Sequence, residues 1–244
     1  MRRQSFVVGL LGAVLAAAPA RAQNAEQPQY REVKWVRDSE EYATIARATY
    51  RAAARAVESG ARQLPRGQAW AVIVDVDETA LDNTAYEMER RTYHQPHDET
   101  VFRAWIARRE SGAVPGAQDF IATVHRLGGH VAWNSNRLEA AREDTRANME
   151  RLGLWTADDR LCLMTADTAY AKRARRAEVA NGTGACSWGQ RLTLLVFVGD
   201  ALGDFPAAGE ADPDAGNDAA FGVRFFLLPN PMYGSWERRV TRRR

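Results

Sequence analysis

Short, almost continuous apolar runs recur along the chain, and each gives way to a polar or turn residue. A run of this length without polar alternation is typical of a strand buried on both faces of a parallel sheet. Segments with helical spacing lie between the runs, at about 117–127, 138–151 and 168–180. Strands that alternate with helices predict a doubly wound α/β fold with a mostly parallel sheet. The runs cover residues 70–74, 130–133, 161–164, 192–198 and 223–228.

An amphipathic helix is predicted before the first of these runs. Apolar residues recur at helical spacing from Tyr42 to Val57, and Asp38 or Ser39 can cap the helix. Ser59-Gly60 marks its expected end. The apolar face of this helix requires a partner, so we expect it to pack on the sheet.

The stretch directly after the first predicted strand has a different composition. Residues 82–116 are polar and aromatic, which predicts a small cap inserted over the edge of the sheet. The chain therefore divides into a leader, a linker, an N-terminal helical segment, a main α/β domain that carries the cap, and a basic tail. Their expected ranges are 1–22, 23–33, 34–66, 67–236 and 237–244.

The leader has the pattern of a cleavable signal peptide. Arg2-Arg3 gives a charged start, residues 6–18 are apolar, and Ala20 and Ala22 are the small residues that a signal peptidase reads. The apolar run is too short to span a bilayer comfortably, and no later segment is better suited. We expect cleavage after Ala22 and a periplasmic or secreted protein, with a retained anchor as the alternative. The arginine pair leaves general and twin-arginine export both open.

The charge balance bears on which partners the protein can bind, and the cysteine content bears on the state of its thiols after export. The chain has 33 basic and 31 acidic residues, a formal net charge of +2, so it lacks the charge excess expected of a protein that binds nucleic-acid polymers. Only two cysteines are present, Cys162 and Cys186. Export would permit a disulfide between them, and two thiols are the alternative, because the sequence does not supply the Cα separation.

Candidate chemistry lies where the predicted strands end. In an open parallel sheet, ligands bind beyond the carboxyl ends of the strands. Five polar residues follow three of the apolar runs, and we expect them to face one crevice. They are Asp75, Asp77, Ser135, Asp200 and Asp204.

Asp75 and Asp77 form the sharpest signal, because two carboxylates two residues apart at a strand end can point into one site. An aspartate that attacks phosphorus forms an aspartyl-phosphate and divides the hydrolysis of a phosphomonoester into two steps. The second carboxylate can protonate the leaving alkoxide and later deprotonate water. An acidic strand-to-loop boundary without chemistry is the alternative.

Two further residues suit a phosphate ligand. Ser135 can donate its hydroxyl to a phosphate oxygen, or it can simply cap the next helix. Lys172, in the first turn of a predicted helix, can offset the charge of a phosphate. Arg173, Arg175 and Arg176 compete for that role, and a solvated basic helix face would explain all four.

Asp75 and Asp200 together suit a hard cation. Mg²⁺ prefers oxygen ligands and keeps several waters, so two carboxylates and one backbone carbonyl suffice. The ion would screen the repulsion between an anionic nucleophile and an anionic substrate. An acidic loop without metal accounts better for the later aspartates Asp212, Asp214 and Asp218 than for Asp200.

Taken in this order, the motifs resemble those of the class C nonspecific acid phosphatases of the haloacid-dehalogenase superfamily, the group that includes bacterial surface lipoprotein 5′-nucleotidases. The resemblance runs from about Trp35 to Trp236. It rests on Asp75-Val76-Asp77-Glu78-Thr79-Ala80-Leu81-Asp82-Asn83, Ser135-Asn136-Arg137, Lys172 with Arg175, Gly199-Asp200 with Asp204-Phe205, and Pro229-Asn230-Pro231-Met232-Tyr233-Gly234-Ser235-Trp236.

The resemblance implies a role for each motif. Asp75 would be the nucleophile and a Mg²⁺ ligand, and Asp77 would be the acid/base and bind Mg²⁺ through its backbone carbonyl. Asp200 would complete the metal site, while Asp204 would orient Lys172 or a metal-bound water. The phosphate would be held by Ser135, Asn136 and Lys172.

The chain departs from the family pattern in two places. No cysteine follows the signal peptide, so a lipid anchor there is not expected. The stretch 181–191 looks longer than usual, which leaves Arg173 and Arg175 as alternatives to Lys172.

Aromatic residues suggest a substrate class. Aromatic rings stack on planar leaving groups, and relatives that accept nucleoside monophosphates use rings near the pocket. Tyr86 and Trp105 in the cap and Tyr233 near the C-terminus are the candidates, with packing of the cap as the alternative. His94 and His97 lack further soft ligands and do not predict a metal site. A phosphotransferase and a noncatalytic binding protein remain the alternatives to a phosphomonoester hydrolase.

Overall fold

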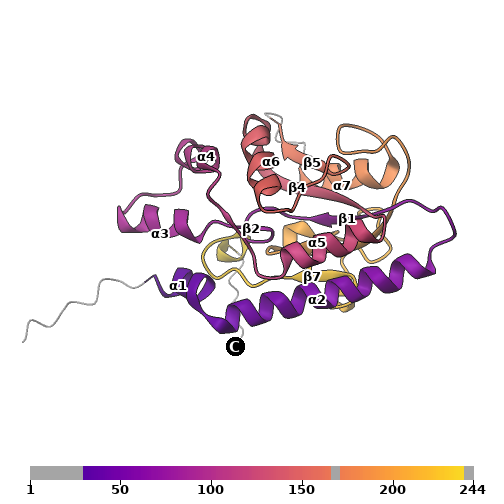
Figure 1. Cartoon of the computed structure of the whole chain (residues 1–244), viewed down its shortest axis with the longest axis horizontal. Helices are drawn as coiled ribbons and strands as arrows, with labels where there is room; N and C mark the ends of the chain where they lie inside the picture. Colours follow the sequence, from indigo (N-terminus) through magenta and orange to yellow (C-terminus); the bar gives the residue numbers. More distant parts are fainter. Residues whose placement is uncertain (1–29, 166–170, 239–244) are drawn as a thin grey trace, which may run out of the picture.

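A five-stranded, wholly parallel sheet forms the centre of the protein (Figure 1). The structure is a computed structural model, and it describes residues 30–165 and 171–238. The predicted signal peptide therefore lies outside the described residues. The strand order β5-β4-β1-β6-β7 confirms the doubly wound α/β fold. The strands are β1 (Trp70–Val74), β4 (His130–Leu138), β5 (Arg160–Met164), β6 (Thr193–Gly199) and β7 (Phe225–Leu227).

The topology reverses at β1, and this reversal creates the crevice in which ligands bind in such folds. From β1 the sheet extends through β4 to β5 on one side and through β6 to β7 on the other. The carboxyl ends of β1, β4 and β6 therefore lie side by side, as the sequence predicted.

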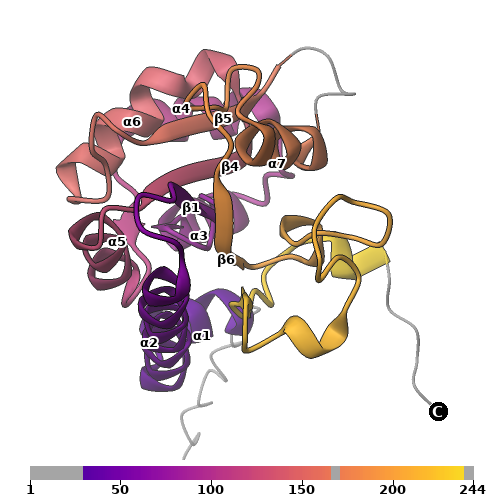
Figure 2. The same cartoon turned by 90° about the vertical axis from the view of Figure 1, so that its right-hand side faces the viewer.

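Alternate residues of the central strand face two different hydrophobic layers. Val72 and Val74 belong to the larger core cluster, whereas Ala71 and Ile73 belong to a second one. Figure 2 shows helices on both faces of the sheet. The first face is covered by α2 (Glu40–Gln63), α5 (Ala117–Arg126) and α6 (Arg142–Arg151), and the second by α7 (Lys172–Asn181).

The long N-terminal helix begins where the sequence predicted but ends later. Ser39 caps α2, and its Oγ accepts from the N–H of Tyr42 at 3.1 Å. The helix continues past Ser59-Gly60, where the sequence predicted its end, to Gln63. A Cβ added to Gly60 would lie 3.1 Å from Leu195 Cδ2 on β6. The glycine therefore permits close packing of α2 on β6 and does not end the helix. A separate helix, α1 (Arg31–Asp38), begins inside the predicted linker.

The strand after His130 is also longer than predicted. β4 continues through Asn134-Ser135-Asn136-Arg137 to Leu138, whereas the apolar run ends at residue 133. The side chains of Asn134, Ser135 and Arg137 in this extension are buried and hydrogen-bonded. These bonds offset the cost of burying polar groups, whose presence concealed the strand in the sequence.

The cap is a folded insertion between β1 and α5. It leaves and returns through two short antiparallel strands, β2 (Leu81–Asp82) and β3 (Gly112–Ala113). Two helices lie between them, α3 (Thr84–Thr92) and α4 (Glu99–Arg108), seen at the left of Figure 1. The remaining short elements are 3-10 turns at Glu139–Ala141, Leu202–Asp204, Asp218–Ala220 and Ser235–Arg238.

Among the described helices, none has the length and apolar character needed to cross a bilayer.

Both cysteines are buried thiols, and they do not form a disulfide in this structure. Cys162 lies on β5, and Cys186 belongs to the segment after α7. Burial, together with a hydrogen bond to Cys186, raises the pKa of the Cys162 thiol well above its ordinary value. A thiol with so little thiolate reacts slowly.

We expect the native protein to react with iodoacetamide at least about tenfold more slowly than the unfolded protein, because burial suppresses the thiolate. Mass spectrometry should count two alkylated cysteines after unfolding without reductant. Alkylation that appears only after reduction would show instead that the purified protein carries a disulfide.

Candidate active site

Three aspartates from two distant segments of the chain meet at the carboxyl edge of the sheet. Asp75 directly follows β1, and its N–H donates to the carbonyl of Val198 on β6 at 3.0 Å. Asp200 follows β6, and Asp204 ends the next 3-10 turn. One carboxylate oxygen from each of these three aspartates lies within 4.8 Å of the others. The strand ends thus bring together residues more than a hundred positions apart.

Lys172 supplies the positive charge at the centre of this cluster. Its Nζ lies 2.5 Å from Asp75 Oδ1 and 2.5 Å from Asp204 Oδ1. Burial alone would lower the pKa of Lys172, but the neighbouring charges of Asp75 and Asp204 raise it above its ordinary value. The ammonium is therefore held in its charged form.

The competing arginines of α7 are engaged elsewhere. Arg175 is fully buried, and its guanidinium donates to Asn134 Oδ1 at 2.7 Å and to Asn136 Oδ1 at 2.9 Å. Asn134 in turn donates to the carbonyl of Lys172 at 3.1 Å, so Arg175 anchors the start of α7 through Asn134. Arg173 is exposed and donates to the carbonyl of Gly209. Lys172 is thus the cation of α7 that the structure places beside Asp75.

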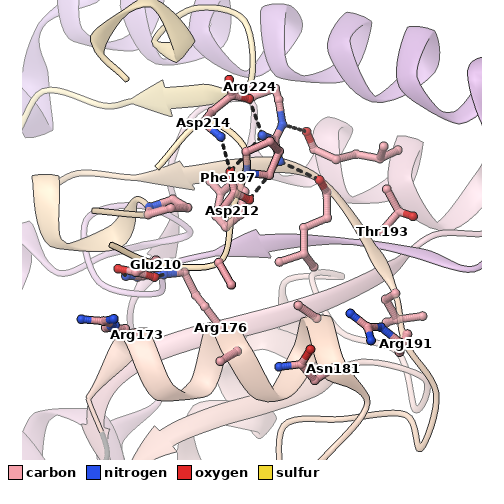
Figure 3. A pocket seen from close by; sticks show the side chains of 18 of the residues that line it. Arg173, Arg176, Asn181, Arg191, Thr193, Phe197, Glu210, Asp212, Asp214 and Arg224 are labelled. Atoms are coloured by element: carbon pink, nitrogen blue, oxygen red, sulfur yellow. Dashed lines mark hydrogen bonds and ion pairs between the residues drawn. The ribbon is translucent and has the colours of Figure 1, made fainter. Parts of the chain in front are cut away.

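Arg173 and Arg176 line a separate cavity of about 950 Å³, between α7, β6 and the segment 206–214 (Figure 3). Arg176 pairs there with Glu210 at 2.6 Å. The three clustered aspartates and Lys172 are not among the residues that line this cavity. The ion pairs within this cavity hold the 206–214 segment in place.

The carboxylate cluster carries more negative charge than Lys172 neutralises. Burial, and then repulsion from Asp204, raises the pKa of Asp200 to about 7. Burial also raises the pKa of Asp75 well above its ordinary value, although Lys172 acts in the opposite direction. Clustered oxygen donors with uncompensated charge are the environment that a divalent cation stabilises. Asp200 is further oriented by the side-chain amide of Asn230, which donates to it at 2.7 Å.

The predicted and observed acidic sets differ in one member. The sequence assigned Asp75, Asp77 and Asp200 to the metal, whereas the clustered side chains are those of Asp75, Asp200 and Asp204. The difference arises because Asp77 was expected to contribute a backbone carbonyl and not its carboxylate. Asp204 approaches closely because Gly199 has no side chain: a Cβ there would lie 2.3 Å from Asp204 Oδ2.

The carboxylate of Asp77 is held by the cap base and by β4. Asn83 Nδ2 donates to Asp77 Oδ1 at 2.8 Å, and Arg137 forms a bidentate ion pair with the same carboxylate. Ser135 Oγ lies 3.5 Å from Asp77 Oδ2 and accepts from the N–H of Arg137 at 3.0 Å. Asp77 and Ser135 therefore adjoin each other at the same edge of the sheet.

The aromatic residues of the cap do not have the exposure that stacking requires. Tyr86 and Trp105 are 4% and 3% exposed and pack together with Phe102 inside the cap. The indole N–H of Trp105 donates to Asn83 Oδ1 at 3.0 Å. The apolar interior of the cap requires both rings, which is the alternative that the sequence left open. Tyr233 is partly exposed and packs against the main core.

Sequence reasoning assigned no role to four residues of the site. Arg137, Asn83 and Asn230 all bond predicted catalytic or metal-binding aspartates. Glu78 is buried, has a φ of 53° and accepts from the N–H of Asn83 at 3.1 Å, so it shapes the turn after β1. All four residues lie within the sequence motifs that carry the family resemblance. The motif alone does not show with which partner each side chain forms a hydrogen bond.

Comparisons with known proteins identify the family and the fold. Residues 12–236 match the family model described as HAD superfamily, subfamily IIIB (acid phosphatase). The structure resembles the class C acid phosphatase from Bacillus anthracis, with a TM-score of 0.71 and 25% identity over 85% of each chain. The same fold occurs in the Bacillus anthracis class C acid phosphatase with tungstate bound, with a TM-score of 0.70 and 24% identity over 85% of each chain.

The chain belongs to the subfamily IIIB acid phosphatases of the HAD superfamily. It is therefore a phosphoric monoester hydrolase, whose substrates are small phosphomonoesters. The family predicted from the sequence motifs is confirmed.

The assignment of Lys172 can be tested against its neighbour on α7. Lys172→Met should lower kcat for p-nitrophenyl phosphate by about 10²-fold or more, because it removes the buried cation beside Asp75. Arg173→Met, the matched control, should change kcat by less than about twofold, because Arg173 faces the separate cavity. Equal losses in two folded variants would contradict the assignment.

Proposed function

We propose that this phosphatase is Mg²⁺-dependent and works through an aspartyl-phosphate formed on Asp75. The observation that carries the proposal is the contact of Asp75 Oδ1 with Lys172 Nζ at 2.5 Å, inside a cluster of three aspartates. A buried carboxylate beside a fixed cation is suited to receive an anionic phosphoryl group.

The chain's own residues account for both steps of hydrolysis. An Asp75 carboxylate oxygen attacks phosphorus, the phosphorus–oxygen bond to the alcohol breaks, and Asp77 gives its proton to the leaving oxygen. In the second step Asp77 takes a proton from water, the water oxygen bonds to phosphorus, and the bond to Asp75 breaks. Phosphate leaves and Asp75 is restored.

The phosphoryl group itself would be bound by Ser135, Asn136 and Lys172. Ser135 adjoins Asp77, and Lys172 adjoins Asp75, so these two residues flank the space between nucleophile and acid/base. The side chain of Asn136 accepts from Arg175, which leaves its amide N–H₂ and its backbone for the phosphate.

The metal would be held by the carboxylates of Asp75 and Asp200 and by the backbone carbonyl of Asp77. An oxygen-only donor set with excess negative charge fits Mg²⁺. When bound, the ion supplies electrostatic screening between the nucleophile and the substrate. In this role Asp204 is a supporting residue, because it holds Lys172 and accepts from the N–H of Ala201.

Nucleoside 5′-monophosphates are the substrate class we favour within the phosphomonoesters. Of the three candidate rings, Tyr233 retains surface for stacking, because Tyr86 and Trp105 are buried. Phosphate release from 5′-nucleotides, sugar phosphates and aryl phosphates, measured side by side, tests this choice.

Two alternatives use the same site. A phosphotransferase would pass the phosphoryl group from Asp75 to an alcohol in place of water, and added acceptor alcohol would then yield a new phosphate ester. A binding protein that has lost turnover would release no phosphate from any monoester in the presence of Mg²⁺.

We also propose that the protein is exported, on the strength of the signal-peptide pattern in residues 1–22. N-terminal sequencing of the processed protein should then begin at Gln23. Full-length material at the membrane would favour a retained anchor.

Asp75→Asn should lower phosphate release by more than about 10⁴-fold, because an amide cannot form the aspartyl-phosphate. Asp119→Asn, which changes an exposed aspartate on α5, should keep wild-type activity. Far-UV circular dichroism should be the same for both variants. Substantial turnover by folded Asp75→Asn would overturn the proposed nucleophile.

Removing the metal should abolish activity. The metal-free protein should also become less stable as the pH rises. Burial raises the pKa of Asp200 from its ordinary 3.8 to about 7, so the metal-free protein should lose stability as the pH rises between these two values. Mg²⁺ at a hundredfold excess over its Kd should restore about 2.7 kcal/mol. Thermal unfolding at pH 5 and pH 8, with EDTA or Mg²⁺, measures this.

Asp200→Asn is the matching variant for the metal experiment. It should raise the melting temperature of the metal-free protein at pH 8 and remove most of the response to Mg²⁺. A Mg²⁺ response that persists in this variant would place the ion elsewhere.

A further inference from the structure

The two carboxylate oxygens of Asp77 have different surroundings. Oδ1 receives three N–H donors, from Asn83 Nδ2 at 2.8 Å, Arg137 Nη2 at 2.7 Å and Arg137 Nε at 3.0 Å. Oδ2 has only longer contacts, with Arg137 Nε at 3.2 Å and Ser135 Oγ at 3.5 Å. Three donors saturate an oxygen, so the proton-accepting capacity of this carboxylate lies on Oδ2.

Arg137 is built into the protein so that it cannot easily turn away from Asp77. Its side chain is 1% exposed, and Nη1 donates to the hydroxyl of Thr145 on α6 at 3.0 Å. The centroid of the Phe102 ring lies 5.7 Å from the guanidinium carbon of Arg137. Among the described residues, Asp77 is the carboxylate with which this buried guanidinium forms an ion pair.

The planar fork of arginine determines the orientation of its partner. A bidentate guanidinium fixes the plane of a carboxylate, whereas a lysine ammonium fixes only a distance. Arg137 and Asn83 together turn Oδ2 toward Ser135, one of the residues proposed to bind the phosphoryl group. The leaving oxygen of a substrate bonded to that phosphoryl group would therefore approach Oδ2 and not Oδ1.

We propose that Arg137 is a positioning residue that holds Asp77 with Oδ2 directed at the leaving group, and so determines how well the enzyme expels poorly stabilised alkoxides. This inference rests on the proposed function, in which Asp77 is the general acid. Arg137 itself does not contact the substrate and exchanges no proton.

A positioning role can be distinguished from a merely structural one by the leaving group. A weakly basic phenoxide such as p-nitrophenoxide departs without much help from an acid, whereas an alkoxide must be protonated as it leaves. Loss of position at Asp77 therefore harms alkyl esters selectively. General loss of structure lowers the rates of both classes by the same factor.

The experiment compares kcat/KM for p-nitrophenyl phosphate with that for alkyl phosphates, using the Mg²⁺-loaded enzyme. kcat/KM includes the departure of the alcohol but not the later hydrolysis of the aspartyl-phosphate, so it isolates the acid step. Arg137→Met should lower kcat/KM for alkyl phosphates by about 10²-fold or more, and for p-nitrophenyl phosphate by less than about tenfold. Arg160→Met, a matched change to a partly buried arginine on β5, should leave the ratio unchanged.

Arg137→Lys keeps the positive charge, so the test remains possible if Arg137→Met does not fold. It should show the same selectivity with a smaller loss, because an ammonium cannot fix the carboxylate plane. An unchanged ratio of the two kcat/KM values in folded Arg137→Lys and, where it folds, in Arg137→Met would overturn the proposal.

Asp77→Asn separates the two levels of the argument. If Asp77→Asn penalises alkyl phosphates selectively but the Arg137 variants do not, only the positioning role fails. If Asp77→Asn shows no selectivity, the assignment of Asp77 as the general acid is itself wrong.

Discussion

The ion pairs of Lys172 with Asp75 and Asp204 are the interaction on which the site depends. Three carboxylates meet within 4.8 Å at a sheet edge that is largely shielded from water. Uncompensated charge of this kind is costly, and the protein tolerates it by fixing one ammonium 2.5 Å from two of the three. The remaining negative charge is the environment that the proposed divalent cation would neutralise.

Several residues around the cluster keep these charged groups in place. Gly199 leaves room for Asp204, and the buried Arg175 anchors the start of α7 through Asn134. On the other face of the sheet, Tyr50 of α2 donates to the carbonyl of Thr79 at 2.5 Å and so fixes the loop after β1. The N-terminal helix is thus connected to the loop that carries Asp77, although it supplies no candidate catalytic residue itself.

The cap is coupled to the same loop through Asn83. This side chain donates to Asp77 and accepts from Trp105 and Ser111, so a single amide joins Asp77 to the interior of the cap. Trp105 therefore contributes to the site from a buried position, where the sequence alone suggested an exposed stacking surface. The position of the cap and the orientation of Asp77 are physically linked.

Local patterns in the sequence were enough to predict the class of fold and the types of residue at the strand ends. Apolar runs and helical spacing report local burial, so they located β1 and β6 within a residue. They could not locate the far end of β4, because its polar residues are buried only by partners distant in sequence. For the same reason they missed the end of α2, where close packing against Leu195 retains Gly60 in the helix.

Only the folded structure shows which charged residues pair across long distances in the sequence. The sequence favoured Lys172 and left Arg173 and Arg175 as alternatives, and only the packing of α7 gives the three cations different partners. Likewise, the pairing of Asp77 with Arg137 spans 60 positions and leaves no periodic signal. Residue type and local pattern determine which chemistry is available, whereas the direction in which each charged group points depends on contacts that form only when the sheet and its helices pack.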